Sequence, residues 1–410
     1  MEKSESKVLS YIDRDEIIEF MQELIRAKSD YPPGDTRQVA EICVKKLKEY
    51  DVKTETLIAP PEVKSINKDG VENYTMPSVI AKIEGAGEGP TLLLNAHIDT
   101  VQAGDISAWK HDPFAGIIED GYIYGRGAGD DKGSVLAQII ATTAIKRAGI
   151  PLKGTLMVNP VADEEASSYR GVKWLCDYGY LNPDMVIIGE QTDNEIACAE
   201  RAIVYFRVTI KGKASHGAMP WMGNNATVRM AEFINLVHQE LIPEVQKVKH
   251  PYLPPTTIST TKIEGGIKTN IIPELCTLDI DCRMVPGITE EFVSRRLNEL
   301  LEKLSKSGQE FKWKVEVIYT EGGIATDTSP DSPLIKTLLN VAEEIKGKPV
   351  KPTGYKQASD GRVFAKRGIP IAIFGPGDPS LGHSPNERVS IDQLVEASKI
   401  LALTILRLIG

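Results

Sequence analysis

Potential metal ligands in the sequence follow short apolar segments, the last of them across a Gly-Pro-Gly loop. The ligands are His97, Asp99, Glu164, Glu165, Glu190 and His383. The apolar segments that precede them are residues 92–94, 155–158, 185–188 and 371–374. Imidazole nitrogen and carboxylate oxygen are ordinary zinc donors, and a catalytic zinc site keeps one position open for water. If these segments meet in the fold, the pattern indicates metal-assisted hydrolysis.

A fifth segment, GRGAGDDKG at residues 125–133, places Asp130 and Asp131 just before a helical pattern at 133–147. A glycine-rich loop at a helix N-terminus can instead hold a phosphate. This loop lacks the P-loop spacing, and its two aspartates would repel a phosphate unless a cation lay between them. The loop therefore adds another potential metal ligand.

Each of these features alone also has a structural explanation. An isolated acidic triplet such as residues 163–165 is usually a solvated turn, and His97 with Asp99 could be a pair satisfied by its neighbours. Five such segments together are harder to explain structurally, because each of them follows or precedes a predicted element at the same edge of a sheet. Ligands of α/β proteins gather at the carboxyl ends of the strands.

The elements that must position these residues follow from hydrophobic periodicity. Helical spacing of apolar residues predicts helices over 15–27, 133–147 and 393–409. Helices that alternate with continuous apolar strands predict an α/β fold, with a mixed, mainly parallel sheet covered by helices. We expect residues 1–199 and 320–410 to form this metal-binding domain.

The segment 200–319 has a different order of predicted elements. Its predicted order is strand, helix, strand, strand, helix, strand, which is the order of a ferredoxin-like α+β domain. We therefore expect an inserted second domain over 200–319.

Composition and charge indicate which partners and which cellular compartment to expect. The 410 residues carry a formal net charge of -9, which argues against a nucleic-acid partner. None of the five cysteines forms a CxxC pair, so neither a disulfide framework nor a thiolate zinc site is indicated. The N-terminus lacks the apolar core of a signal peptide, and Lys399 and Arg407 interrupt the apolar C-terminal stretch. We expect a cytoplasmic protein with no membrane partner.

Six segments resemble the signatures of the M20 metallopeptidase family. In order along the chain they are NAHIDTV, GRGAGDDKG, ADEEAS, IIGEQTD, KASHGAMP and GPG…GHSPNE. The resemblance extends from about residue 78 to 391, and the family includes acetylornithine deacetylases, succinyl-diaminopimelate desuccinylases, aminoacylases and glutamate carboxypeptidases. It implies a zinc-peptidase-like catalytic domain and a domain over 200–319 that acts as a lid and in dimerisation.

The resemblance also implies a role for each candidate ligand. Asp130 would bridge two Zn²⁺ ions, with His97 and Glu190 on one ion and Glu165 and His383 on the other. Asp99 would accept the second ring N–H of His97 and so fix its tautomer. Glu164 would be the general base for a metal-bridging hydroxide that attacks the amide carbonyl. Co²⁺ or Mn²⁺ could replace zinc, because oxygen-rich sites accept several divalent ions.

The remaining residues implied by the resemblance contact the substrate. His216 would reach the active site of the partner subunit in a homodimer and polarise the scissile carbonyl. Asn270, Arg283 and Arg362 would contact the substrate, since a guanidinium can grip a carboxylate bidentately. The sequence departs from the family pattern at Gln191, where proline is common, and at Gly217, where serine is frequent.

The expected substrate is a small N-acyl amino acid, with N-succinyl as one option. Ser359-Asp360-Gly361-Arg362 resembles the desuccinylase branch. An M20-type carboxypeptidase or dipeptidase that acts on short peptides is the alternative. A non-catalytic scaffold is disfavoured, because such proteins usually lose a ligand or the base, and here all are present.

Overall fold

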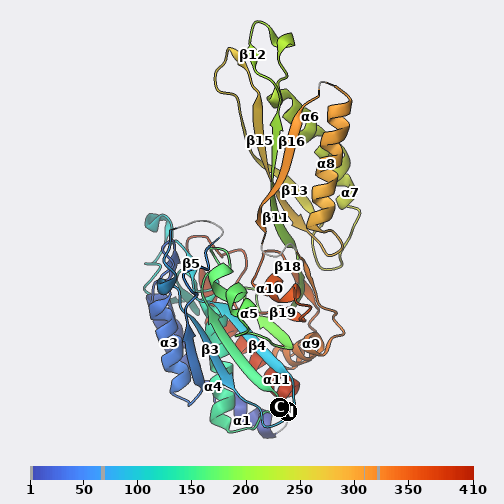
Figure 1. The fold of residues 1–410 in the computed structure, drawn as a ribbon. Coiled ribbons are helices and arrows are strands. Elements are labelled where there is room, and N and C mark those ends of the chain that lie inside the picture. The colour runs from blue at the N-terminus through green and yellow to red at the C-terminus, as the bar shows by residue number, and fades with distance from the viewer. Residues whose placement is uncertain (1–2, 66–69, 309, 321–323) are drawn as a thin grey trace. The chain divides into compact units, whose positions relative to one another are not determined.

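The computed structural model of the chain describes residues 3–65, 70–308, 310–320 and 324–410. The chain forms two compact units, which are drawn together in Figure 1. Unit 1 comprises Met1–Ala199, Asp327–Tyr355 and Ser359–Gly410, and unit 2 comprises Glu200–Thr326 and Lys356–Ala358. The boundary predicted at residue 320 differs from this division, because residue 320 ends a strand of the unit 2 sheet.

Unit 1 is built on a nine-stranded sheet whose centre is parallel. The four central strands are, in spatial order, β19 (Ile371–Ile373), β9 (Met185–Ile188), β4 (Thr91–His97) and β8 (Thr155–Val161). Their side chains are almost all buried, as expected for parallel strands covered on both faces.

The four central strands pair in parallel, as predicted for the middle of the sheet, but the prediction of a mainly parallel sheet does not extend to the strands beside them. Antiparallel pairs flank them on both sides, through β10 (Ala197–Glu200), β3 (Ser78–Ile83) and β2 (Lys53–Leu57). The edge strand β2 is largely exposed, and antiparallel strands tolerate water on one face. The short strands β17 (Thr326–Asp327) and β18 (Thr353–Tyr355) complete the sheet.

Helices cover both faces of the central strands (Figure 1). On one face, α4 (Lys132–Ala148) packs against β4 and β8 and against α11 (Ile391–Ile409). Fifteen of the 17 residues of α4 are buried, so it is a core helix rather than an amphipathic one. On the other face, α5 (Trp174–Asp177) and α10 (Gly361–Ala365) contribute to a core cluster with residues of all four central strands.

Further helices surround α4. They are α1 (Lys3–Leu9), α2 (Arg14–Arg26) and α3 (Arg37–Lys48), whereas α9 (Pro333–Lys346) packs against α11. The carboxylate of Glu16 in α2 lies 2.6 Å from Lys46 Nζ of α3 and 2.8 Å from Arg147 Nη1 of α4. These half-buried ion pairs tie three helices together.

A two-stranded and a three-stranded sheet also lie in unit 1. In the first, β1 (Asp30–Tyr31) pairs with β5 (Thr100–Val101). In the second, β7 (Tyr122–Tyr124) pairs with both β6 (Ile117–Glu119) and β20 (Arg388–Ser390). No helix in the described part of the chain is long and apolar enough to cross a membrane.

Unit 2 contains a four-stranded antiparallel sheet. Its spatial order is β13 (Thr257–Gly265), β15 (Leu275–Met284), β11 (Ala202–Lys211) and β16 (Lys312–Thr320). Helices α6 (Ala226–Leu236) and α8 (Glu290–Lys306) pack on the sheet and against each other (Figure 1). The helical segment continues beyond α6 as η5 (Val237–Leu241) and α7 (Ile242–Val245). The order along the chain is the predicted strand, helix, strand, strand, helix, strand.

Candidate metal centre

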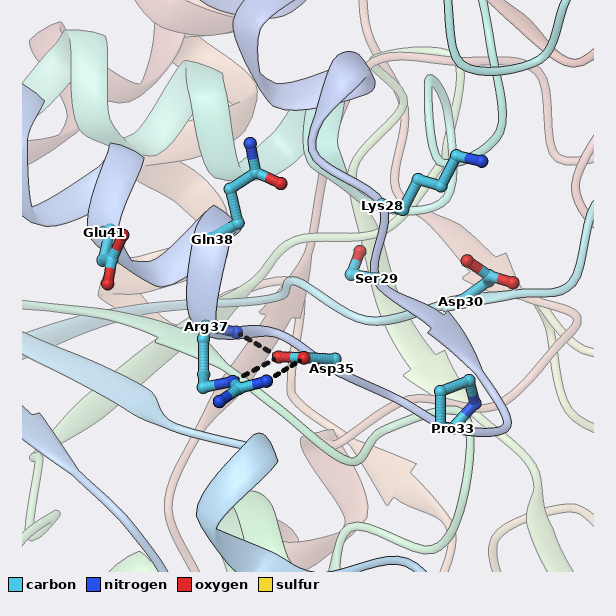
Figure 2. Close-up of a pocket in the computed structure, with 8 residues that line it drawn as sticks. All are labelled: Lys28, Ser29, Asp30, Pro33, Asp35, Arg37, Gln38 and Glu41. Carbon is cyan, nitrogen blue, oxygen red and sulfur yellow. Dashed lines mark hydrogen bonds and ion pairs between the residues drawn. The ribbon is translucent and has the colours of Figure 1, made fainter.

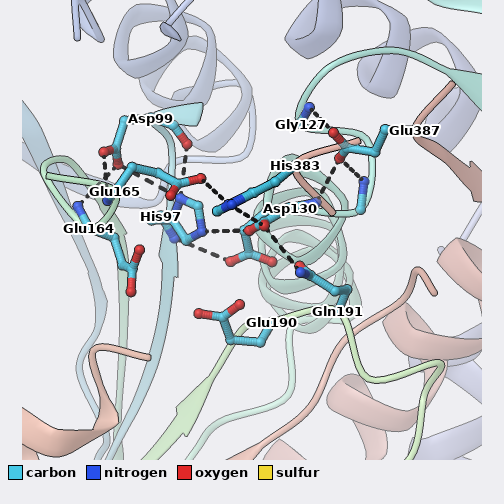
Figure 3. A network of polar contacts seen from close by, with 12 residues as sticks. His97, Asp99, Gly127, Asp130, Glu164, Glu165, Glu190, Gln191, His383 and Glu387 are labelled. Atoms are coloured by element: carbon cyan, nitrogen blue, oxygen red, sulfur yellow. Dashed lines mark hydrogen bonds and ion pairs between the residues drawn. The ribbon is translucent and has the colours of Figure 1, made fainter. Parts of the chain in front are cut away.

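Two groups of potential metal donors lie in unit 1 and share one carboxylate. The first group is His97, Asp130 and Glu190, and the second is Asp130, Glu165 and His383. Within each group, one donor atom per residue lies within 4.8 Å of the others. The donors come from the ends of β4, β8 and β9, from the loop before α4 and from the segment after β19 (Figure 3).

The carboxylate of Asp130 is the centre of this cluster. His97 Nε2 lies 3.0 Å from its Oδ1, and His383 Nε2 lies 3.2 Å from its Oδ2. His383 Nε2 also lies 3.1 Å from Glu165 Oε1. One aspartate thus presents an oxygen to each group, which is the arrangement required of a carboxylate that bridges two ions.

The charged groups of the cluster shift one another's pKa strongly. Hydrogen bonds with Asp130 and then Glu165 raise the pKa of His383 to about 10. Burial, and then the negative charge of Asp131, raises the pKa of Glu190 well above its usual value. Buried carboxylates at this density are costly unless cations compensate them. The donor set of nitrogen and oxygen atoms therefore fits divalent metal ions.

Asp99 contacts His97 through its main chain. His97 Nδ1 lies 2.9 Å from the carbonyl oxygen of Asp99, whereas the nearest carboxylate oxygen is 3.7 Å away. Because a carbonyl oxygen only accepts hydrogen bonds, Nδ1 carries a proton and Nε2 is left to face Asp130. The predicted ring contact is therefore made by the carbonyl of Asp99 rather than by its carboxylate.

The carboxylate of Asp99 instead holds the turn that carries the two glutamates. It accepts hydrogen bonds from the backbone N–H groups of Glu164, at 3.3 Å, and Glu165, at 3.1 Å. Glu165 belongs to the second donor group and Glu164 to neither. The structure thus distinguishes two adjacent carboxylates that the sequence could not order.

Several residues around the cluster were not predicted as site residues. Gln191 Nε2 donates to Asp130 Oδ2 at 3.1 Å, and the Tyr355 hydroxyl donates to Glu190 Oε2 at 2.8 Å. Asp131 Oδ2 accepts from the backbone N–H of His97 at 3.2 Å. Glu387 contacts the loop that carries Asp130 (Figure 3). Among these, Asp131, Gln191 and Glu387 stood in motifs of the sequence, but nothing in their spacing indicated these contacts.

Unit 2 brings His216 and Asn270 together. Strand β12 (Ser215–His216) pairs with β14 (Ile271–Ile272), and the N–H of Gly217 donates to the carbonyl of Asn270 at 2.8 Å. The backbone N–H of Ala218 donates to Nδ1 of the exposed His216 at 3.1 Å. In the neutral ring the proton is then on Nε2, so His216 presents an N–H donor.

The two predicted substrate arginines are differently placed. Arg283, on β15 of unit 2, already grips the carboxylate of Asp281 through Nε at 2.7 Å and Nη2 at 3.0 Å. Arg362 belongs to unit 1 and is buried at the start of α10. Because Arg283 is already paired with a carboxylate and Arg362 is buried, neither guanidinium is directly available to a substrate carboxylate.

A separate cavity of about 470 Å³ lies in unit 1 near the start of α3 (Figure 2). Acidic and basic side chains both line it, and Asp35 pairs with Arg37 within it. None of the predicted site residues lines this cavity. We therefore assign the candidate site to the donor cluster and not to this cavity.

A parallel-centred α/β unit with clustered histidines and carboxylates at its strand ends is the architecture of a metal-dependent hydrolase. Comparison with known proteins agrees with this class. The family model described as peptidase family M20/M25/M40 matches residues 93–407. The chain belongs to this family, whose members are metal-dependent hydrolases of amide and peptide bonds.

Individual relatives cover most of the chain. A probable succinyl-diaminopimelate desuccinylase of Staphylococcus epidermidis is 28% identical over 366 residues, covering 81% of this chain and 89% of that protein. The N-formyl-4-amino-5-aminomethyl-2-methylpyrimidine deformylase of Bacillus subtilis is 30% identical over 349 residues, covering 79% and 81%. Among solved structures, aminopeptidase PepT from Bacillus cereus matches with a TM-score of 0.74 at 19% identity, covering 97% and 99%. This last match shows the fold.

Proposed function

We propose that the chain is a two-metal amidohydrolase that removes the acyl group from a small N-acyl amino acid, with N-succinyl amino acids included. The observation that carries this proposal is the pair of donor groups that share Asp130, with Glu164 beside them but in neither group. We take Zn²⁺ as the resident ion, with Co²⁺ or Mn²⁺ as substitutes. When bound, the two ions would lower the pKa of a water molecule and polarise the amide carbonyl.

The residues of the chain would handle the protons. Glu164 is half-buried, and Asp99 holds its backbone through the hydrogen bond described above. As general base it would take the proton of the attacking water and deliver it to the leaving amine. Since Glu165 is already engaged with His383, the two glutamates can divide metal binding and proton transfer between them.

His216 would reach the active site of the partner subunit and stabilise there the charge that develops on the carbonyl oxygen. The Ala218 N–H presets Nε2–H as the donor, so the ring needs no change of tautomer before it acts. A donor prepared before the reaction costs no reorganisation in the transition state. Asn270 lies next to His216 in the same pair of loops and would contact the substrate with it.

The names of the relatives favour acyl removal over peptide cleavage. Both the desuccinylase and the deformylase are named for removing an acyl group. A substrate with a free carboxylate would suit Arg283 or Arg362, because guanidinium pairs bidentately with carboxylate. For Arg283 this requires an exchange of its present partner, Asp281.

We also propose that unit 2 pairs with a second copy of the chain as a lid and dimerisation domain. β13 is an edge strand of nine residues, and Lys262 and Glu264 near its end carry opposite charges. In an antiparallel pair of two β13 strands, Lys262 of one copy can face Glu264 of the other. Reversing the charge of Lys262 alone should weaken a dimer in sedimentation, and the double exchange K262E/E264K should restore it. A wild-type monomer at micromolar concentration would refute this part of the proposal.

Metal content and a substrate panel together test the proposed function. The panel contains succinyl-diaminopimelate, N-acetyl amino acids and dipeptides. We expect about two zinc equivalents per chain and turnover of an acyl amino acid. Two ions with turnover of dipeptides only would favour the carboxypeptidase or dipeptidase alternative. A protein that binds no metal in supplemented neutral buffer would overturn the proposal.

A further inference from the structure

A completely buried carboxylate, that of Glu387, lies inside the loop that carries Asp130. Its Oε1 accepts hydrogen bonds from the backbone N–H groups of Gly129, at 2.9 Å, and Asp130, at 3.0 Å. Its Oε2 accepts from the N–H of Gly127 at 3.1 Å (Figure 3). Three amides of one turn thus converge on one side chain.

Arg126 balances the charge of this carboxylate. Its Nη1 lies 2.5 Å from Glu387 Oε2, and its Nη2 donates to the carbonyl of Ser384 at 3.3 Å. The guanidinium also lies over the ring of Trp109, 5.2 Å from the ring centroid. Both members of the ion pair are buried, with exposed fractions of 2% for Arg126 and 0% for Glu387.

Glu387 therefore joins two segments that each supply a metal donor. It stands four residues after His383, and its carbonyl accepts from the N–H of Gly125 at 3.0 Å. The loop that Glu387 holds places Asp130 beside other carboxylates. Before any ion is bound, the charges of these carboxylates repel one another. A turn held by three charge-assisted hydrogen bonds can resist that repulsion.

We propose that Glu387 is a positioning residue that fixes the main chain of Asp130 relative to His383, so that the shared carboxylate can reach both ions. This inference rests on the proposed two-metal function. Residues that orient ligands from outside the coordination sphere typically change metal affinity by ~10–100-fold. Loss of Glu387 should weaken the second ion more than the first, because only the second group joins Asp130 to His383.

The test compares Glu387→Gln with wild type and with a matched control, Glu5→Gln. Glu5 is also a buried carboxylate paired with an arginine, Arg407, at 2.8 Å, but it belongs to helix α1, outside the segments that carry Asp130 and His383. Zn²⁺ titration of the metal-free proteins, the visible spectrum of the Co²⁺ forms and amide exchange of residues 125–131 are measured.

For Glu387→Gln we expect ~10–100-fold weaker binding of the second ion, an altered Co²⁺ spectrum and faster exchange in 125–131, with Glu5→Gln unchanged. If the variant does not fold, Glu387→Asp keeps the charge but shortens the reach, and should show the same changes in a folded protein. Wild-type affinities together with wild-type exchange in either folded variant would overturn the inference. If wild type itself binds no ion, the proposed function fails, whereas the exchange of 125–131 still decides whether Glu387 holds the loop.

Discussion

The substitution Glu164→Gln should separate proton transfer from metal binding. Glutamine keeps the shape of the side chain, and the backbone N–H that Asp99 accepts from is untouched. Because Glu164 belongs to neither donor group, metal content should stay at the wild-type value. Loss of a general base costs ~10²–10⁴ in rate. At about 1.4 kcal/mol per factor of ten, this is roughly 3–6 kcal/mol of barrier, and we expect it in kcat.

The neighbouring substitution Glu165→Gln is the matched control. It weakens one of the three donors in the second group, whose His383 contact is 3.1 Å. We expect it to lower affinity for one ion by more than the ~10–100-fold of an outer-shell change. The assay measures kcat, KM and metal content of both variants on the best substrate of the panel. Loss of metal from Glu164→Gln, or activity within about tenfold of wild type, would refute the assignment of Glu164.

Three further outcomes are expected. His216→Ala should lower kcat by ~10²–10³ with metal content unchanged. The control His238→Ala, at an exposed histidine of the same unit, should match wild type. If the two variants have equal kcat values, His216 has no part in the mechanism. Arg170→Met leaves the buried Asp163 carboxylate without its cation and should cost about 3–5 kcal/mol in denaturant unfolding; a loss below about 1 kcal/mol would contradict this. Burial alone would raise the pKa of Glu16, but its two cationic partners outweigh burial and lower the pKa. Its stabilisation is therefore present above the unfolded pKa and lost as pH falls through the folded one. Glu16→Gln should cost about 1–3 kcal/mol at pH 7 and progressively less below about pH 4.5.

Long periodic elements of the sequence were predicted closely. The three predicted helices correspond to α2, α4 and α11, whose observed ends lie within two residues of the predicted ones. The continuous apolar runs are the central parallel strands, and their shared edge brings donors from distant segments within 4.8 Å. Periodicity and the rule for strand ends were sufficient for this, because both depend on local sequence.

Contacts between distant residues could not be predicted in this way. Glu387 and Asp130 are 257 positions apart, and Tyr355 and Glu190 are 165 apart, so no spacing encodes either pair. The hydrogen bond from His97 to the carbonyl of Asp99 could not be predicted from the sequence either, because it depends on the direction of the backbone and not on residue type. Strands of two or three residues, such as β17 and β18, are too short to show a period, and they were therefore not predicted.

Helix α4 begins two residues after Asp130 and is buried over almost its whole length. Amides in such a helix exchange with solvent only when the whole domain opens, because no smaller opening exposes them. A chelator should therefore empty the centre without loosening the helix, and the empty protein should accept ions again without refolding. We therefore expect the helix to give the loop that carries Asp130 a fixed end whether or not ions are bound, while Glu387 holds the loop itself.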